Sequence, residues 1–241
     1  MNPSDRTVAP RVRVTGNRFI DSLPAATVEA IARIADLRTY PEGTELARRG
    51  DLVGEVYFPT GGAIAHVEPG EGEATIEIAA IGRDGVSGFE ALLGVAEAQF
   101  TRVTTLPLAT FCVDAPALGR IYASSEPFRA LLGRYAVASI RLASMRAACR
   151  DHHLVDRRLA GWILALYRLS NSPELRVTHA LVAQLLGAER AGITRAYGRL
   201  AAAGAIRYER GRIRVRDEAR LGAAACGCAD AATAVSASVY A

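Results

Sequence analysis

The sequence predicts an α+β protein: a small antiparallel β-barrel or jelly roll, then a long dimerisation helix, then a C-terminal winged helix-turn-helix. Three observations support this prediction. Short apolar runs punctuated by glycine fill residues 38–113, a helical apolar repeat extends over residues 125–152, and two short helical segments around Gly187 precede a basic hairpin. Short strands separated by glycine turns are typical of small barrels, whereas a long periodic stretch indicates a helix.

Composition limits the classes of protein to which the chain can belong. Half of the 241 residues are hydrophobic, which is enough for a packed core in one large or two modest domains. No stretch approaches the roughly 20 consecutive apolar residues that cross a bilayer, and the N-terminus lacks the apolar core of a secretory signal. We therefore expect a cytoplasmic protein without a membrane partner.

Positive charge is concentrated in the C-terminal part of the chain. All 29 basic residues are arginine; residues 1–150 hold 16 of them against 17 acidic residues, and residues 151–241 hold 13 against 8. Residues 176–216 contain 9 arginines and 2 acidic residues, a net charge of +7. Such an asymmetry indicates a polyanionic partner for this part alone.

The N-terminal part is expected to form the barrel, as a domain over residues 17–124. Residues 1–16 are polar and irregular and predict a loose arm, and residues 17–37 predict one or two short helices. Apolar runs then alternate with glycine turns, and residues 85–94 interrupt them with one or two predicted helical turns. The runs and turns that form this pattern are residues 40–44, 49–51, 56–62, 63–67, 75–80, 102–105 and 111–113.

Residues 125–152 predict one long helix that pairs with a second copy of the chain. Apolar residues recur there at alternating steps of three and four from Phe128 to Cys149, the spacing of a heptad coiled coil. The alternative is a helix packed on its own barrel. The predicted dimer interface consists of Leu131, Tyr135, Ala138, Leu142 and Met145.

Residues 177–200 predict two helices joined by a tight turn, within a domain expected over residues 153–225. Thr178 is a candidate N-cap of the first helix, which Gly187 would end in a left-handed conformation. The buried side of the second helix is predicted to consist of Ile193, Ala196, Tyr197 and Leu200. Its opposite side carries arginines, an arrangement that can place one helix in a DNA major groove.

A basic hairpin follows the second helix. Apolar residues alternate with arginines in residues 206–215, and Arg210-Gly211 is the predicted turn. A basic hairpin in this position is a wing, and it argues against a hairpin of helices whose arginines serve solubility alone. The alanine-rich residues 217–241 allow an early helical turn, and residues 226–241 are expected to be a flexible tail.

Double-stranded DNA is therefore the expected partner of the C-terminal domain. Arg190 and Arg195 lie near the start of the second helix, where base edges are reached, and arginine can bind guanine with two hydrogen bonds. We expect at least one of them to contact a base. The expected phosphate contacts are Thr178, His179, Thr194, Arg199, Arg210 and Arg212.

Cysteine and histidine spacing supports no metal site and no cofactor. The cysteines, Cys112, Cys149, Cys226 and Cys228, form neither a disulfide framework nor paired CxxC motifs. Cys149 lies one helical turn from His153, which follows His152, but no third or fourth ligand is evident, so hinge packing is the preferred interpretation. Cys226 and Cys228 are interpreted as part of the tail rather than a redox pair. No arrangement of nucleophile, base or paired carboxylates supports an enzyme.

The order of barrel, long helix and winged helix-turn-helix resembles the Crp/Fnr family of bacterial transcription regulators, over residues 17 to about 225. The residues that carry this resemblance are Tyr40-Pro41-x-Gly43, Gly50-Asp51, the run from Val56 to Gly62, Gly82-Arg83-Asp84-Gly85-Val86-x-Gly88, Arg158-Leu159-Ala160-x-Trp162 and the block from Thr178 to Val215. The resemblance implies a barrel of cyclic-nucleotide-binding type, a DNA-binding homodimer, RNA polymerase as a further partner and a small-molecule effector of unknown identity.

The sequence departs from the family pattern at the effector site. Members that bind cyclic nucleotides have a Gly-Glu pair and a later Arg-Ser/Thr-Ala run, in which the carboxylate binds ribose and the arginine binds phosphate. Here Phe89 follows Gly88 and displaces Glu90, and Val103 follows Arg102. Glu90 and Arg102 are the candidate effector residues, but we expect Arg102 to lie out of position and cyclic nucleotides not to bind.

Two further departures concern cofactor and DNA preference. Family members with an iron–sulfur cluster carry cysteines near the N-terminus, and residues 1–111 contain none. The second helix begins Glu189-Arg190-Ala191-Gly192, so the acidic base reader of the family is absent. Two alternatives stay open: a redox or metal sensor using Cys149 with His153 or Cys226 with Cys228, and a small-molecule-binding module that does not bind DNA.

Overall fold

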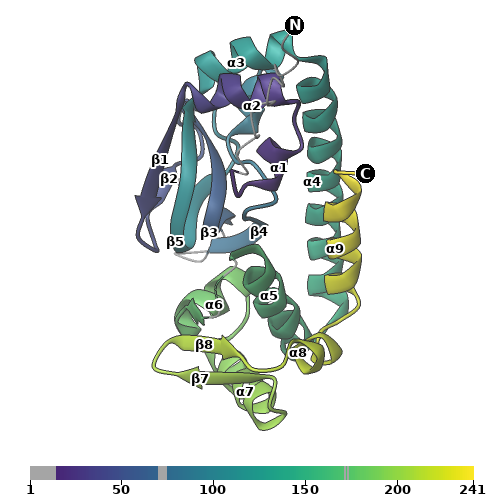
Figure 1. Ribbon diagram of the computed structural model, residues 1–241. Helices are drawn as coiled ribbons and strands as arrows, with labels where there is room; N and C mark the ends of the chain where they lie inside the picture. Colours follow the sequence, from purple (N-terminus) through teal and green to yellow (C-terminus); the bar gives the residue numbers. More distant parts are fainter. Residues whose placement is uncertain (1–14, 70–74, 171, 173) are drawn as a thin grey trace, which may run out of the picture.

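The computed structural model describes residues 15–69, 75–170, 172 and 174–241. An N-terminal domain with a β-sheet, a long helix beside it and a C-terminal domain of helices with a small sheet follow one another along the chain (Figure 1). This is the predicted α+β fold. The arm predicted for residues 1–16 lies outside the described residues, apart from Thr15 and Gly16.

Two short helices precede the sheet, α1 (Arg18–Asp21) and α2 (Ala25–Ala32). Asn17 caps α1 by accepting a hydrogen bond from the backbone N–H of Ile20, and its own Nδ2 donates to the backbone oxygens of Pro59 and Gly85 at 2.8 and 3.0 Å. A buried asparagine with these partners fixes the entry of the chain onto the barrel.

The large sheet is antiparallel throughout. Its strands are β1 (Ala35–Tyr40), β2 (Glu45–Ala47), β3 (Glu55–Pro69), β4 (Thr75–Ile81) and β5 (Thr101–Asp114). They are ordered β1-β5-β3-β4, with β2 paired to β5. The register between β3 and β5 shifts between Pro59 and Ile64. Within this stretch Gly62 lies so close to β5 that a Cβ on it would be 2.1 Å from the carbonyl oxygen of Pro107.

A short 3-10 helix, η1 (Phe89–Leu93), interrupts the strands where the sequence predicts a helical turn. The glycines on either side, Gly88 and Gly94, have φ of 90° and 86°, which other residues rarely adopt. After β5 the chain forms α3 (Ala115–Ser124), capped by Asp114, which the sequence analysis did not identify.

The predicted long helix is α4 (Glu126–His152), with Ser125 as its N-cap. Its expected dimer seam, however, faces its own subunit. Leu131, Tyr135 and Ala138 are only 2%, 8% and 8% exposed, and Leu142 and Met145 pack half-buried against the same apolar cluster. The barrel and α1 cover Leu131, Tyr135 and Ala138 within one subunit, so these three do not form an exposed seam. The assignment of Leu142 and Met145 to a dimer interface stays a prediction.

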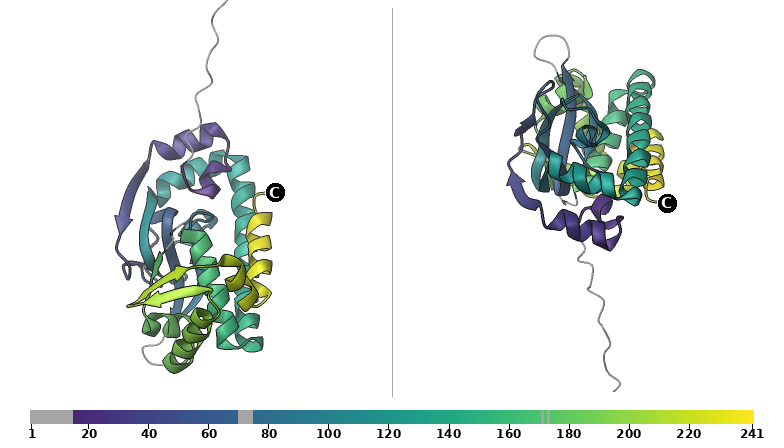
Figure 2. Two further views of the ribbon diagram at one scale, coloured as in Figure 1. Left: turned by 60° about the horizontal axis from the view of Figure 1, so that its bottom comes forward. Right: turned by 90° about the horizontal axis from the view of Figure 1, so that it is seen from above.

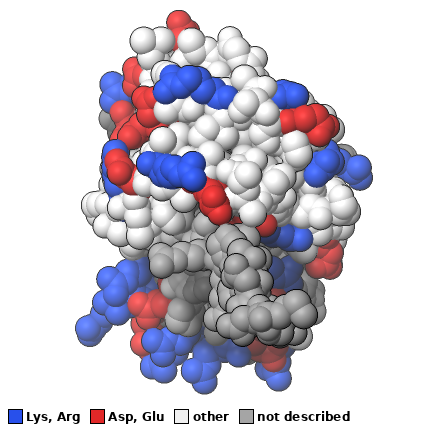
Figure 3. Space-filling view, turned by 45° about the horizontal axis from the view of Figure 1, so that its top comes forward, with Lys and Arg blue, Asp and Glu red and all other residues white. Residues whose placement is uncertain are grey.

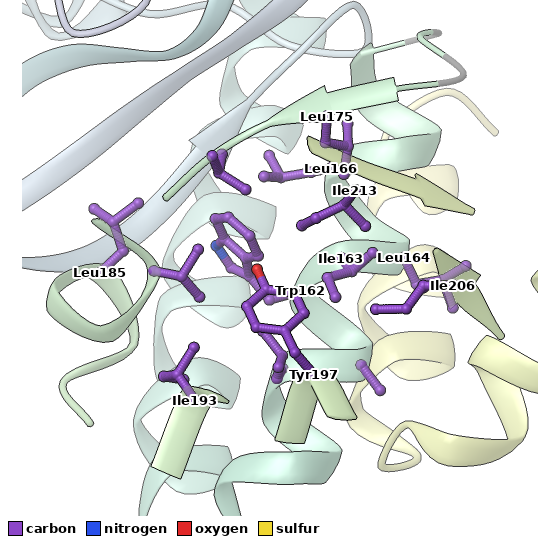
Figure 4. Packing of buried hydrophobic residues seen from close by; sticks show 14 of the residues in the cluster. Trp162, Ile163, Leu164, Leu166, Leu175, Leu185, Ile193, Tyr197, Ile206 and Ile213 are labelled. Carbon is purple, nitrogen blue, oxygen red and sulfur yellow. The ribbon is translucent and has the colours of Figure 1, made fainter. Parts of the chain in front are cut away.

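The C-terminal domain contains two sets of elements. Its helices are α5 (Val155–Ser170), α6 (His179–Leu186), α7 (Arg190–Ala202) and α8 (Glu218–Ala224). Its strands are β6 (Glu174–Arg176), β7 (Ile206–Glu209) and β8 (Arg212–Val215), ordered β6-β8-β7. Figure 4 shows α5, α7 and the strands meeting around buried residues such as Trp162, Ile163 and Tyr197. The sequence analysis missed β6, which has only three residues.

The expected flexible tail is instead a helix, α9 (Cys228–Ser238), and this expectation is corrected. In both views of Figure 2, α9 lies alongside α4. Val235 and Val239 are buried there, and Arg134 donates to the backbone oxygen of Val239 at 3.0 Å. In the described part of the chain, no helix combines the length and the apolar character that crossing a membrane requires.

Candidate nucleic-acid interface

Helices α6 and α7 form the predicted helix-turn-helix. Thr178 caps α6 through a hydrogen bond of 3.2 Å from the N–H of Leu181 to its Oγ1. Gly187 ends α6 with a φ of 54°, and a Cβ on it would meet the guanidinium of Arg150 at 2.8 Å. The turn therefore needs glycine for its left-handed backbone, whereas the flexible end of the Arg150 side chain could move aside.

Helix α7 is buried on one side and exposed on the other, as the sequence predicts. Ile193, Ala196, Tyr197 and Leu200 are all at most 4% exposed. The opposite side carries four exposed candidates, Arg190, Thr194, Arg195 and Arg199. Arg199 forms an ion pair with Asp156 of α5. Among the described residues, neither Arg190 nor Arg195 pairs with an acidic group, so both guanidinium groups can bind an anion.

His179, predicted as a phosphate contact, is half-buried and takes part in the packing of the domain. Its ring stacks on Tyr197 at 4.5 Å and on Tyr208 at 4.4 Å between ring centroids. Its Nδ1 lies 3.0 Å from the hydroxyl of Thr194, and its Nε2 is buried. Burial, with the nearby charge of Arg190, lowers the pKa of His179. The stacked ring therefore joins α6, α7 and β7.

The wing is a two-residue hairpin, as predicted. Arg210 and Gly211 form its turn with φ of 48° and 78°, which suits a tight turn between twisted strands. Glu174 of β6 forms ion pairs with Arg212 and Arg214 at 3.3 and 3.2 Å. This pairing holds the hairpin against β6 and leaves Arg210 at the tip. The lower end of the molecule in Figure 3, where this domain lies, gathers arginines.

The candidate effector residues lie together inside the barrel. Arg102, the largest fully buried side chain, is 1% exposed and forms an ion pair with Glu90 of η1. The expectation that Arg102 lies out of position is therefore wrong: its strand places it inward, and Glu90, one residue later than the family pattern, reaches it. Arg102 Nε has no hydrogen-bond partner among the described residues.

A buried histidine borders this ion pair. His66 is 5% exposed, and its Nε2 lies 2.7 Å from the hydroxyl of Ser87. Burial, and to a lesser degree the charge of Arg102, lowers the pKa of His66 to about 3. The sequence analysis missed both residues, since a lone histidine in a strand carries no pattern of its own. Together they make the barrel interior polar beneath η1.

The cysteines and the histidines beside Cys149 lie in two parts of the structure, the barrel and the end of α4. Cys112 is buried in the barrel. Cys149, His153, Cys226 and Cys228 come together in one cluster, which sequence spacing did not reveal. The neighbouring His152 is exposed and takes no part in the cluster.

Comparison with known proteins agrees with this geometry. Residues 157–224 match the family of Crp-like helix-turn-helix domains. The cyclic AMP receptor protein of Thermus thermophilus is 27% identical over 218 residues, which cover 89% of this chain and 99% of the relative.

Two solved structures of bacterial proteins share this fold. The c-di-GMP-responsive global regulator CLP of Xanthomonas campestris superposes with a TM-score of 0.63 at 18% identity, over 80% of this chain and 99% of its own. FixK2 of Bradyrhizobium japonicum superposes with a TM-score of 0.68 at 16% identity, over 80% of this chain and 98% of its own. At these identities the likeness establishes the fold.

A barrel joined by a long helix to a winged helix-turn-helix with an exposed basic helix defines a DNA-binding transcriptional regulator. Residues 157–224 form a Crp-like helix-turn-helix domain. Over 89% of its length the chain is also similar to the cyclic AMP receptor protein, and its fold is that of Crp/Fnr-type regulators.

Proposed function

We propose that the protein binds double-stranded DNA as a homodimer, with α7 of each subunit in a major groove and Arg210 of the wing beside the phosphate backbone. The observation that carries this proposal is the exposed side of α7, where Arg190 and Arg195 lack acidic partners among the described residues. Base contacts come from these two arginines. Thr178, Thr194, Arg199, Arg210 and Arg212 contact phosphate and set the orientation.

A second seam on α4 supports the homodimer. Residues at alternating steps of three and four line the side of α4 away from the barrel and α9: Ala130, Gly133, Val137, Ile140, Ser144 and Ala147. All are exposed, and Val137 and Ile140 are 68% exposed each. Large exposed aliphatic side chains at heptad spacing, flanked by small residues, suit close pairing with a second copy of the same helix.

The barrel is proposed to act as the sensor domain, with its effector site around Glu90 and Arg102. The buried ion pair and His66 give that site charge and hydrogen-bonding groups. Cyclic AMP and cyclic GMP are not the proposed effectors, because Val103 supplies no hydroxyl beside Arg102 and Phe89 packs against Tyr135 at 5.4 Å. RNA polymerase is the proposed partner at the promoter.

Selection of DNA from the genome tests the proposal. Purified full-length protein is mixed with genomic fragments, and the bound fragments are recovered, sequenced and used in binding assays. We expect a two-fold symmetric consensus and a steep loss of affinity with salt, about −0.9 in log–log slope for each phosphate neutralised. Recovery of random fragments with a shallow salt slope would contradict specific binding through α7.

A further inference from the structure

Four metal-binding side chains meet where α4 ends. Cys149 lies in the last turn of α4, His153 is the residue that follows α4, Cys226 lies between α8 and α9, and Cys228 begins α9. Their ligand atoms all lie within 4.8 Å of one another. Cys149 Sγ is 3.4 Å from Cys226 Sγ, and Cys228 Sγ is 3.8 Å from His153 Nδ1.

These separations are close to those between the ligands of a single tetrahedral ion. With zinc–sulfur bonds of about 2.3 Å, tetrahedral geometry separates two sulfur ligands by about 3.8 Å. In a [4Fe–4S] cluster each ligand binds a different iron atom, and in a [2Fe–2S] cluster the four ligands are divided between two irons, so the ligand atoms stand farther apart than around one ion. We propose that Cys149, His153, Cys226 and Cys228 bind one thiophilic divalent metal ion of the zinc class.

The surroundings suit such an ion. Three thiolates with a divalent cation carry a net charge of −1, and a nearby cation would balance it. Arg158 lies close enough to interact electrostatically with Cys149 and Cys226, and it also donates to the backbone oxygen of Leu186 at the end of α6. The side chain of Arg158 would therefore connect an ion in the cluster to the helix-turn-helix.

The cluster also brings the start of α9 to the end of α4. Cys228 and Cys226 are 75 and 77 residues from their partners His153 and Cys149, so the ion would close a long loop. It would hold the start of α9 to the end of α4, while Val239 near the other end is buried and bonded to Arg134. We infer that the ion fixes α8 and α9 to the hinge between α4 and α5.

Metal titration of the full-length protein tests the site without DNA. The protein is stripped of metal under reducing conditions and titrated with Zn²⁺ against a chromophoric chelator, with elemental analysis. We expect one ion per chain. His153→Ala and Cys228→Ser should weaken binding by about 100-fold or more, beyond the roughly 10–100-fold that loss of an outer-shell partner costs. His152→Ala is the matched control and should bind as the wild type does.

A second measurement covers variants that fold poorly. The wild-type protein is loaded with Co²⁺, and a tetrahedral thiolate site should give intense visible bands and sulfur-to-cobalt charge transfer, both displaced by Zn²⁺. Hydrogen exchange in α8 and α9 should become faster on chelation, while the barrel strands are unchanged. Weak octahedral bands, or a Cys149–Cys226 disulfide in protein that takes up no stoichiometric metal when reduced, would overturn the proposal.

Discussion

The indole Nε1 of Trp162 in α5 lies 3.2 and 3.3 Å from the two carboxylate oxygens of Glu77 in β4, so one buried carboxylate joins the DNA-binding domain to the barrel. Arg146 of α4 binds the same carboxylate at 2.5 Å. Glu77 is 6% exposed, and a buried carboxylate is stable only when such partners satisfy it.

Removing this carboxylate should loosen the contact between the two domains. We expect Glu77→Ala to lower the free energy of unfolding by about 1–3 kcal/mol, less than for a fully buried pair because the side chain of Arg146 is 34% exposed. Trp162 is the single tryptophan, so its fluorescence reports on the contact directly. Unchanged emission and unchanged urea denaturation in Glu77→Ala would show that the contact has no energetic role. Glu42→Ala, at an exposed position outside this contact, is the control.

The two faces of α4 should respond differently to a charge. Ile140→Glu should give folded monomers in light scattering and weaken DNA binding, because it places carboxylates in the proposed pairing seam. Leu131→Glu should instead unfold the subunit, since it buries a charge against the barrel. Folded dimers of Ile140→Glu at micromolar concentration would exclude this seam.

The arginines of α7 should separate specificity from general affinity. Arg190→Ala and Arg195→Ala are expected to flatten preference among sequences, with about 1–3 kcal/mol of discrimination lost for each bidentate base contact. Arg199→Ala should weaken binding to all sequences alike and lower the salt slope. Arg120→Ala, an exposed arginine of α3, is the matched control in gel-shift titrations. If Arg190→Ala and Arg195→Ala prefer the same DNA sequences as strongly as the wild type does, the assignment of α7 as the base-contacting helix is contradicted.

Stability should fall as the pH is lowered below about 6.5, because His66 is buried in its neutral form. Its folded pKa of about 3 is below the unfolded value of 6.5, so between these values only the unfolded state takes up the proton. The loss is about 1.4 kcal/mol per pH unit, or roughly 2 kcal/mol at pH 5. Urea denaturation from pH 7 to pH 5 should show a smaller loss in His66→Gln than in the wild type. If the stability of His66→Gln and of the wild type falls equally with pH, His66 is not buried in its neutral form.

Cyclic AMP and cyclic GMP should not bind with useful affinity. The guanidinium of Arg102 is already paired with Glu90, and a cyclic phosphate would have to replace that buried pair without a neighbouring hydroxyl. Titration calorimetry with each nucleotide checks this. A dissociation constant in the low micromolar range that is lost in Arg102→Ala would show that the barrel reads a cyclic nucleotide.

The sequence by itself determined the elements whose signals are local. The cap Thr178, the turn glycine Gly187 and the Arg210-Gly211 hairpin each act within a few residues, so they predict the helix-turn-helix and the wing. The apolar repeat of residues 128–149 predicts α4 in the same local way. The apolar side of α7 follows from the helical period in the same way. The Glu90 and Arg102 pair was also named from sequence, although not its geometry.

Only the tertiary structure decided which surfaces meet. Helix α4 carries two heptad seams, one with Leu131 and one with Val137, and periodicity cannot say which of them faces the barrel. The inward direction of Arg102 depends on how β5 pairs with β3, and α9 is buried only because α4 lies beside it. Cys149 and Cys226 are 77 residues apart, and a pattern along the chain carries no information on contacts that the path of the backbone creates.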